Sequence, residues 1–134
     1  MTNYIALLKE NDLKATIQRT SILRSIDRAG HINIDDIYEQ LKEEYPTLSL
    51  ATIYKNIIVM QESNVIIEVP MNGQKSKYEL KKDDHIHLIC QVCGEIQDRE
   101  ITPQTKETLV IENFQLSSSQ INLYGQCQQC QRHA

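Results

Sequence analysis

The sequence predicts an α+β protein, with an N-terminal winged helix-turn-helix domain and a small C-terminal α/β domain that holds a four-cysteine zinc site. Amphipathic helices with good capping residues occupy the first half of the chain. Two β-rich segments separated by a glycine turn follow them, and two Cys-x-x-Cys pairs lie further on. We expect domains spanning residues 1–80 and 81–134, joined by a charged hinge.

Apolar residues at helical spacing within residues 3–10 predict a short first helix. Thr16 is a good N-cap for the second helix, because its hydroxyl accepts a hydrogen bond from a first-turn amide, and Gly30 fits its C-terminal stop. The third helix opens at Asn33 or Asp35 and is expected to run until Pro46 ends it.

Ser49 is expected to cap a fourth helix that runs to about Ser63. A helical wheel places four apolar side chains on one face: Leu50, Ile53, Ile57 and Met60. Thr52, Lys55 and Asn56 lie on the opposite face, which is polar and compact. This helix is the second after the connection at residue 31, so in a winged helix-turn-helix it would enter the DNA major groove.

Two strands and a wing are expected next, at residues 65–69 and 76–80, with a turn at 71–73. The second domain is expected to contain strands at 85–90, 95–98 and 120–125. A helix from Pro103 to about Phe114 is expected between the last two strands. Thr108, Leu109 and Ile111 are expected to be its packed side chains.

The net charge of −4 is unlike the strongly basic balance of many nucleic-acid-binding domains. Each predicted domain carries a net charge of −2, so dividing the chain does not change this conclusion. Any contact with DNA must therefore use a local patch, for which Lys14, Arg19, Lys55 and Asn56 are the candidates.

Four cysteines form two pairs, Cys90 with Cys93 and Cys127 with Cys130. Zinc prefers thiolate ligands in tetrahedral geometry, and each Cys-x-x-Cys closes a tight loop on one side of the ion. Buried or redox-active cysteines are the alternative, but two such pairs in a short chain favour zinc. Four thiolates leave no open coordination position, so the ion would be structural. His133 is not expected to be a ligand.

His85 and His87 are two residues apart on a predicted strand, so both side chains point to one face. Two imidazoles on one face make half of a chelate for a divalent metal, and an ordinary polar face is the alternative. Glu79, Asp83, Asp84 and Asp98 are carboxylates nearby in sequence. His31 by itself has the features of a loop histidine.

The chain resembles the ferric uptake regulator (Fur) family of metal-dependent bacterial repressors, and within it the peroxide-sensing branch. The matching segments are LKATIQR at 13–19, HINIDDIY at 31–38, SLATIYKN at 49–56, DHIHLICQVCG at 84–94 and LYGQCQQC at 123–130. They cover the chain nearly end to end in the expected order. The resemblance implies a homodimer that binds a palindromic operator in double-stranded DNA through the winged helix and dimerises through the second domain. A cytoplasmic location is the default expectation, because the start of the chain has no basic, apolar signal segment.

The resemblance also implies roles for individual residues. The four cysteines would hold structural zinc, and an iron or manganese ion would be regulatory, with His31, Glu79, His85, His87 and Asp98 as ligands. In the peroxide-sensing branch, oxidation of a ligand histidine, here His31 or His85, releases the metal. Lys14 would reach the minor groove, Arg19 a phosphate, and Tyr54 with Lys55 the base edges; Thr52 and Asn56 complete the DNA-contacting set.

Comparison with the family pattern bears on the choice of signal and on the number of metal sites. Glu79 stands where the peroxide-sensing branch usually has Asp, which favours iron-level or zinc-level sensing as the alternative function. Asp98 matches the peroxide-sensing branch. Ser118 and Ser119 replace histidines that many relatives use for a third metal site, so this site is expected to be absent.

Other classes of protein fit the sequence less well. The N-terminal segment lacks the features of a signal peptide or membrane span, so no membrane partner is expected. A metallohydrolase or oxygenase would suit an open histidine–carboxylate site, but no H-E-x-x-H motif, nucleophile or small-molecule substrate pocket is evident. A metal-storage module would leave the winged helix unused. We therefore expect a regulator rather than an enzyme.

Overall fold

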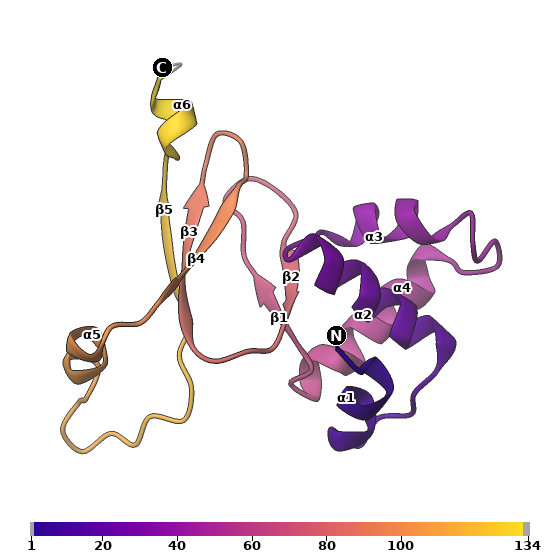
Figure 1. Cartoon of the computed structure of the whole chain (residues 1–134), viewed down its shortest axis with the longest axis horizontal. Coiled ribbons are helices and arrows are strands. Elements are labelled where there is room, and N and C mark those ends of the chain that lie inside the picture. Colours follow the sequence, from indigo (N-terminus) through magenta and orange to yellow (C-terminus); the bar gives the residue numbers. More distant parts are fainter. Residues whose placement is uncertain (1, 133–134) are drawn as a thin grey trace. The chain divides into compact units, whose positions relative to one another are not determined.

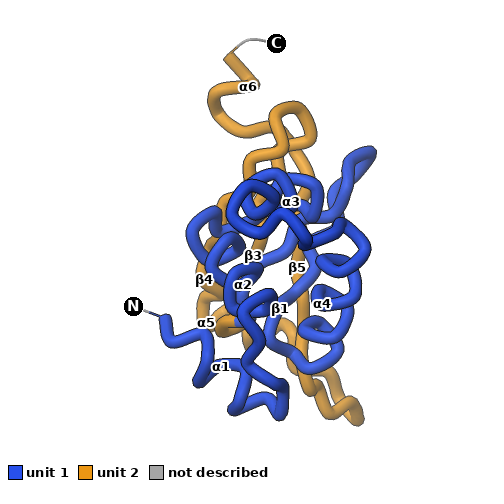
Figure 2. The backbone as a smooth tube through the Cα atoms, turned by 90° about the vertical axis from the view of Figure 1, so that its right-hand side faces the viewer, with its two compact units in different colours: residues 1–81 blue, residues 82–134 orange. Residues whose placement is uncertain are grey.

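The computed structural model describes residues 2–132. Six helices and five strands lie within this range, and the chain divides into two compact units after Lys81 (Figure 2). We refer to residues 1–81 as unit 1 and to residues 82–134 as unit 2. The predicted α+β fold class is confirmed. None of the described helices is long and apolar enough to span a bilayer.

Unit 1 contains α1 (Tyr4–Glu10), α2 (Ile17–Ala29), α3 (Ile34–Leu41), α4 (Leu50–Glu62), β1 (Ile66–Val69) and β2 (Lys77–Leu80). Every one of these helices begins after a residue whose side chain accepts a hydrogen bond from a backbone N–H three residues further on: Asn3, Thr16, Asn33 and Ser49. Such caps stabilise a helix by about 1 kcal/mol each. The caps predicted at Thr16, Asn33 and Ser49 are confirmed.

The core of unit 1 is formed where α2, α3 and α4 pack together. The side chains with no exposed surface include Leu8, Ile22, Leu23, Ile26, Ile37, Ile53 and Met60. The predicted apolar face of α4 is therefore buried, except at Leu50, which is 37% exposed at the start of the helix. The expected end of α3 at Pro46 was wrong: the helix stops at Leu41, and turns follow it.

The wing of unit 1 is the antiparallel pair β1 and β2, in which Ile66 lies opposite Leu80. Ile32, in the connection between α2 and α3, forms an antiparallel bridge with Tyr78 of β2. Their backbone groups exchange two hydrogen bonds, of 3.2 and 2.8 Å. This bridge fixes the α2–α3 connection against the wing.

Unit 2 contains β3 (His85–Cys90), β4 (Ile96–Glu100), α5 (Pro103–Thr108), β5 (Ile121–Gly125) and α6 (Gln128–Arg132). The strand order is β4-β3-β5; β4 is antiparallel to β3, whereas β5 is parallel to it. Figure 1 shows these strands side by side, with α6 beyond the end of β5. The parallel pairing matters because it brings the C-terminal ends of β3 and β5 together.

The expected helix from Pro103 to Phe114 was too long, because α5 ends at Thr108. Asn113 has a φ of 63°, a left-handed conformation that a continuing helix does not allow. The expected packing was also wrong for Thr108, which is exposed, and for Ile111, whose side chain is 62% exposed, whereas Leu109 is half-buried. β4 begins one residue later than expected and ends at Glu100, and α6 was not predicted. His133 lies outside the described residues.

Candidate metal centres and DNA-contacting surface

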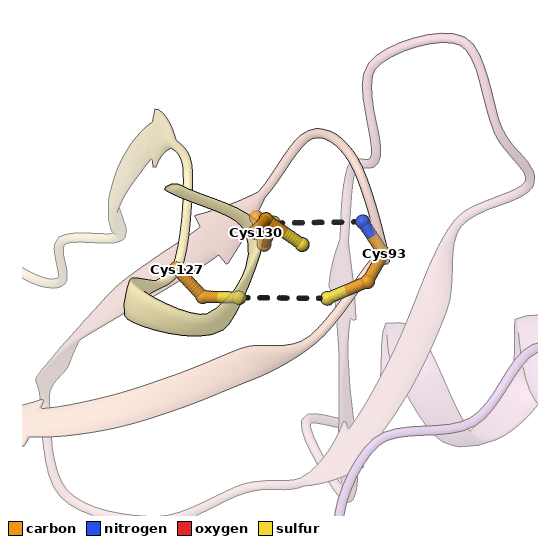
Figure 3. A group of neighbouring side chains, drawn as sticks. Cys93, Cys127 and Cys130 are labelled. Carbon is orange, nitrogen blue, oxygen red and sulfur yellow. Dashed lines mark hydrogen bonds between the residues drawn. The ribbon is translucent and has the colours of Figure 1, made fainter. Parts of the chain in front are cut away.

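The four cysteines converge at one end of the sheet in unit 2. Their sulfur atoms all lie within 4.8 Å of one another, and none forms a disulfide. The Sγ atoms of Cys93 and Cys127 are 3.8 Å apart, and Figure 3 shows them facing each other. Two thiolates bound tetrahedrally to one zinc ion at about 2.3 Å would be separated by about this distance. The group fits structural zinc.

Strand pairing explains why the two Cys-x-x-Cys segments meet. Cys90 is the last residue of β3 and lies opposite Gly125, the last residue of β5. The backbone N–H of Gln91 donates to the carbonyl of Gly125 at 2.8 Å, which extends the pairing toward Cys127. Gly94 has a φ of 80°, a conformation that favours glycine, and so lets the chain turn sharply after Cys93.

Backbone donors already favour a thiolate in this group. The backbone N–H groups of Cys127 and Cys93 lower the pKa of the Cys90 thiol from its usual 9 to about 6. Hydrogen bonding to the Cys127 side chain raises the pKa of Cys130 to about 12. Such opposed shifts are expected where several sulfurs share one small space, and a divalent cation would allow all four to lose their protons.

In unit 1, His31 and Glu79 form a close pair, with His31 Nε2 2.8 Å from Glu79 Oε2. Because Ile32 bridges Tyr78 in antiparallel register, His31 comes to lie across from Glu79. Glu79 is only 1% exposed. An imidazole and a buried carboxylate held side by side are donors that iron, manganese or zinc accept.

In unit 2, His85 and His87 point to the same face of β3, with their Nε2 atoms 2.9 Å apart. Their ring centroids are 4.4 Å apart in an edge-to-face arrangement. Asp98 lies opposite His87 on β4, and its Oδ1 is 3.5 Å from His85 Nε2 and 3.8 Å from His87 Nε2. The structure thus brings three of the predicted ligands together within one sheet.

Sequence reasoning missed the groups that orient these ligands. The Nδ1 atoms of His85 and His87 lie 2.9 Å from the carbonyl oxygen of Asp83 and from Asn122 Oδ1 respectively. Lys82 Nζ lies 2.5 Å from Asp98 Oδ2, the oxygen not directed at the histidines. Strand register on β5 could have indicated Asn122, but only if the parallel pairing with β3 had been known.

The candidate DNA-contacting residues of unit 1 are linked by hydrogen bonds between α2 and α4. Arg19 donates from Nε to Asn56 Oδ1 and from Nη1 to the carbonyl of Lys14, both at 3.0 Å. Asn56 in turn donates to the carbonyl of Thr52 at 3.0 Å. Thr52 and Asn56 are half-buried and only Lys55 of the predicted polar face is exposed, so this face is less exposed than expected.

Lys14, Tyr54 and Lys55 are exposed, and Tyr54 has 42% of its surface accessible. Three guanidinium N–H groups of Arg19 are not used in its two hydrogen bonds to Asn56 and Lys14, since the group carries five. These positions leave cationic and hydroxyl groups on the start of α2 and on α4, where a winged helix approaches nucleic acid.

A winged-helix unit, a four-thiolate zinc group and a histidine–carboxylate donor set together define a metal-dependent transcriptional regulator. The chain belongs to the ferric uptake regulator family, whose sequence profile matches residues 10–124. The resemblance in the sequence motifs is confirmed by this match.

Individual relatives support the same family. The chain is 33% identical over 129 residues to the peroxide operon regulator of Bacillus subtilis, covering 93% of this chain and 89% of that protein. It is 32% identical over 132 residues to the peroxide-responsive repressor PerR of Staphylococcus aureus strain Mu50, covering 95% of this chain and 88% of the relative.

Solved structures show the same fold. The ferric uptake regulator of Vibrio cholerae superposes with a TM-score of 0.76 at 29% identity, covering 93% of this chain and all of that one. The peroxide stress regulator of Campylobacter jejuni superposes with a TM-score of 0.67 at 31% identity, covering 96% of this chain and all of that one. Both the metal-sensing and the peroxide-sensing branches thus share this architecture.

Proposed function

We propose that the protein is a peroxide-responsive repressor in the cytoplasm that binds a palindromic operator as a homodimer when a regulatory metal is present. The observation that carries the proposal is the cluster of His85, His87 and Asp98, in which two imidazole Nε2 atoms lie 2.9 Å apart. Relatives named for their peroxide response support the choice of signal.

The proposed regulatory ligands come from both units. His31 and Glu79 contribute one imidazole and one carboxylate, whereas unit 2 contributes His85, His87 and Asp98. This set of three nitrogen and two oxygen donors suits iron or manganese. Cys90, Cys93, Cys127 and Cys130 are proposed to hold a separate structural zinc ion, which keeps the metal-binding strands paired.

Metal-dependent DNA binding follows from the location of these ligands on both sides of the connection at residues 81–82. Ligands from two units that share one ion restrict the relative orientation of those units. If that orientation matches the spacing of successive major grooves, metal and DNA binding become coupled, and each raises the affinity for the other.

Release of repression requires that a ligand be lost. Bound ferrous iron would activate hydrogen peroxide, and the net reaction converts an imidazole C–H to a 2-oxo-imidazole, with water as the other product. The imidazole supplies the two electrons that reduce the peroxide. We propose His31 and His85 as the oxidised residues, because an oxidised imidazole is a poorer ligand and its loss would separate the units.

Six residues are proposed to contact DNA: Lys14, Arg19, Thr52, Tyr54, Lys55 and Asn56. Lys14 would enter the minor groove, Arg19 would bind a phosphate, and Tyr54 with Lys55 would read base edges. Because the chain is acidic, these few cations carry the electrostatic attraction, and affinity should fall with salt.

A sensor of iron or zinc concentration is the second candidate, and Glu79 favours it. Its carboxylate is buried beside His31, and the peroxide-sensing branch usually has the shorter Asp at this position. This candidate predicts a reversible response to metal concentration and no response to peroxide.

Two measurements test the proposal. A gel shift with a palindromic promoter fragment should show binding with manganese and loss of binding after chelation. The iron-loaded protein treated with hydrogen peroxide should then gain one oxygen atom on the peptide containing His31 or His85, detected by mass spectrometry. If DNA binding depends on metal but no oxygen is added and binding survives peroxide, the metal-level sensor is the correct function.

A further inference from the structure

We propose that Asn122 is a positioning residue for the regulatory metal, holding the His87 imidazole in the tautomer whose Nε2 faces the ion. The inference rests on the proposed function only in taking His87 as a metal ligand. Asn122 lies directly opposite His87 in the parallel pairing of β5 with β3. Its Oδ1 is 2.9 Å from His87 Nδ1.

The tautomer follows from the chemistry of this hydrogen bond. An amide oxygen can only accept, so the proton must be on His87 Nδ1, and Nε2 then carries the lone pair that a metal needs. His87 is only 1% exposed, so water competes little with Asn122 for the ring. One neutral side chain on β5 thereby selects the ligating atom of a residue on β3.

His85 is held in the same tautomer by a different acceptor, the backbone carbonyl of Asp83 at 2.9 Å. The two Nε2 lone pairs therefore converge, at a separation of 2.9 Å. Two metal–nitrogen bonds of about 2.1 Å that meet at a right angle span about 3 Å. Oriented lone pairs at this separation repel each other unless a cation lies between them, so the arrangement is prepared for an ion.

The neutral acceptor also adjusts the strength of the ligand. Partners of a ligand histidine fix its orientation and raise its basicity, and their loss commonly costs about 10- to 100-fold in metal affinity. A carboxylate at position 122 would raise the basicity of His87 more than an amide does. Asn122 thus fixes the geometry of His87 while leaving the ion exchangeable, as a regulatory site requires.

The wild-type protein alone can overturn the proposal. In the full-length, zinc-loaded chain without regulatory metal, long-range ¹H–¹⁵N correlation spectra should show His87 as the Nδ1–H tautomer. A predominant Nε2–H tautomer would mean that the Asn122 amide group donates to the ring, and the inference would be wrong.

Three variants then test the role of the hydrogen bond, with manganese ions as the probe and free Mn²⁺ measured by electron paramagnetic resonance. Asn122→Leu should bind Mn²⁺ about 10- to 100-fold more weakly and lose the single tautomer. Asn122→Asp should keep the Nδ1–H tautomer and bind Mn²⁺ at least as tightly as the wild type. Asn72→Leu, the same change at an exposed turn of unit 1, should have no effect.

The outcomes separate a positioning role from simple packing. If Asn122→Asp binds Mn²⁺ as weakly as Asn122→Leu, an acceptor at position 122 does not sustain the affinity and the inference fails. The tautomer and the Mn²⁺ affinity are measured without DNA. The inference about Asn122 can therefore be correct even if the proposed metal-dependent repression is wrong. Conversely, His87→Ala with undiminished Mn²⁺ affinity would remove His87 from the ligand set and the inference with it.

Discussion

The position of the buried Glu79 carboxylate beside His31 depends on a backbone contact between the neighbouring residues Ile32 and Tyr78. Its carboxylate is 1% exposed and lies 2.8 Å from His31 Nε2. The pair exists because Ile32 and Tyr78 exchange backbone hydrogen bonds, which brings two residues distant in sequence into register. A buried carboxylate beside an imidazole is costly to desolvate, and a shared cation offsets that cost.

Glu79→Gln is therefore expected to weaken regulatory Mn²⁺ binding by about 10-fold or more, because a neutral amide is a poorer ligand for this ion. The zinc content should not change. The measurement is a Mn²⁺ titration of the zinc-loaded protein. Glu68→Gln, on the paired strand β1, is the matched control, since Glu68 accepts hydrogen bonds from Ser76 and Gln61. Equal affinities for the two variants would exclude Glu79 as a ligand.

Helices α2 and α4 are linked by a side-chain hydrogen bond between Arg19 and Asn56. The hydrogen bond of 3.0 Å between their side chains restricts the guanidinium, which also donates to the carbonyl of Lys14. Helix packing positions the two elements, whereas this polar link positions the cation expected to meet DNA. Holding a flexible side chain in advance reduces the entropy lost on binding.

Asn56→Ala is expected to reduce operator affinity, because Arg19 loses its support and the contact proposed for Asn56 itself is lost. The salt dependence of binding should stay nearly unchanged, because Arg19 keeps its charge. Arg19→Ala should reduce affinity and also lower the slope of log K against log salt by about 1. Fluorescence anisotropy over a range of salt concentrations measures both quantities. The inference about preorganisation is contradicted if Asn56→Ala binds like the wild type.

The parallel pairing of β3 and β5 connects the two metal groups of unit 2. The same strand β5 carries Asn122, which contacts His87, and leads directly to Cys127 and Cys130. A unit of this size buries little apolar surface, so a structural metal contributes much of its stability. The zinc group is thus expected to maintain the orientation of a regulatory ligand.

Removing zinc with a chelator should therefore separate β5 from β3 and weaken Mn²⁺ binding as well. Hydrogen exchange at the amides of Leu88 to Cys90 and of Leu123 to Gly125 would report the separation of the strands. Restoring zinc should restore Mn²⁺ affinity if the thiols are kept reduced. Unchanged Mn²⁺ affinity in a zinc-free protein would show that the two groups are independent.

Unit 2 has several large apolar side chains that its own described residues leave exposed. Exposed side chains include Val110 at 80%, Phe114 at 64%, Ile111 at 62% and Leu123 at 52%. β5 is also an edge strand of the three-stranded sheet. If these side chains form one contiguous patch, it would be a suitable interface for the proposed homodimer.

Phe114→Asp is accordingly expected to shift the protein from dimer toward monomer at micromolar concentration, measured by light scattering after size-exclusion chromatography. A charge buried in an apolar interface is strongly unfavourable. Ile17→Asp is the control, because Ile17 is 70% exposed in unit 1 and a carboxylate is favourable in the first turn of a helix. A monomeric wild type would contradict the proposed assembly.

Local sequence patterns were enough to predict the helix caps at Thr16, Asn33 and Ser49, the wing, the grouping of the four cysteines, and the shared face of His85 and His87. These features depend on residues close in sequence: hydrogen bonds three residues apart, the two-residue period of a strand, and the loop closed by Cys-x-x-Cys. The end of α5 at Thr108 was missed because no glycine or proline follows it before Phe114 to mark a stop. The overall family also followed from local motifs, since these span most of the chain.

Contacts between residues distant in sequence could not be predicted in this way. His31 beside Glu79, Arg19 beside Asn56, and Asn122 beside His87 all depend on helix packing or on the register between strands. Sequence spacing carries no information about such register until the pairing of the strands is known. The physical reason is that hydrogen bonds between strands and packing between helices are formed by segments remote in the chain, whereas sequence patterns describe neighbours.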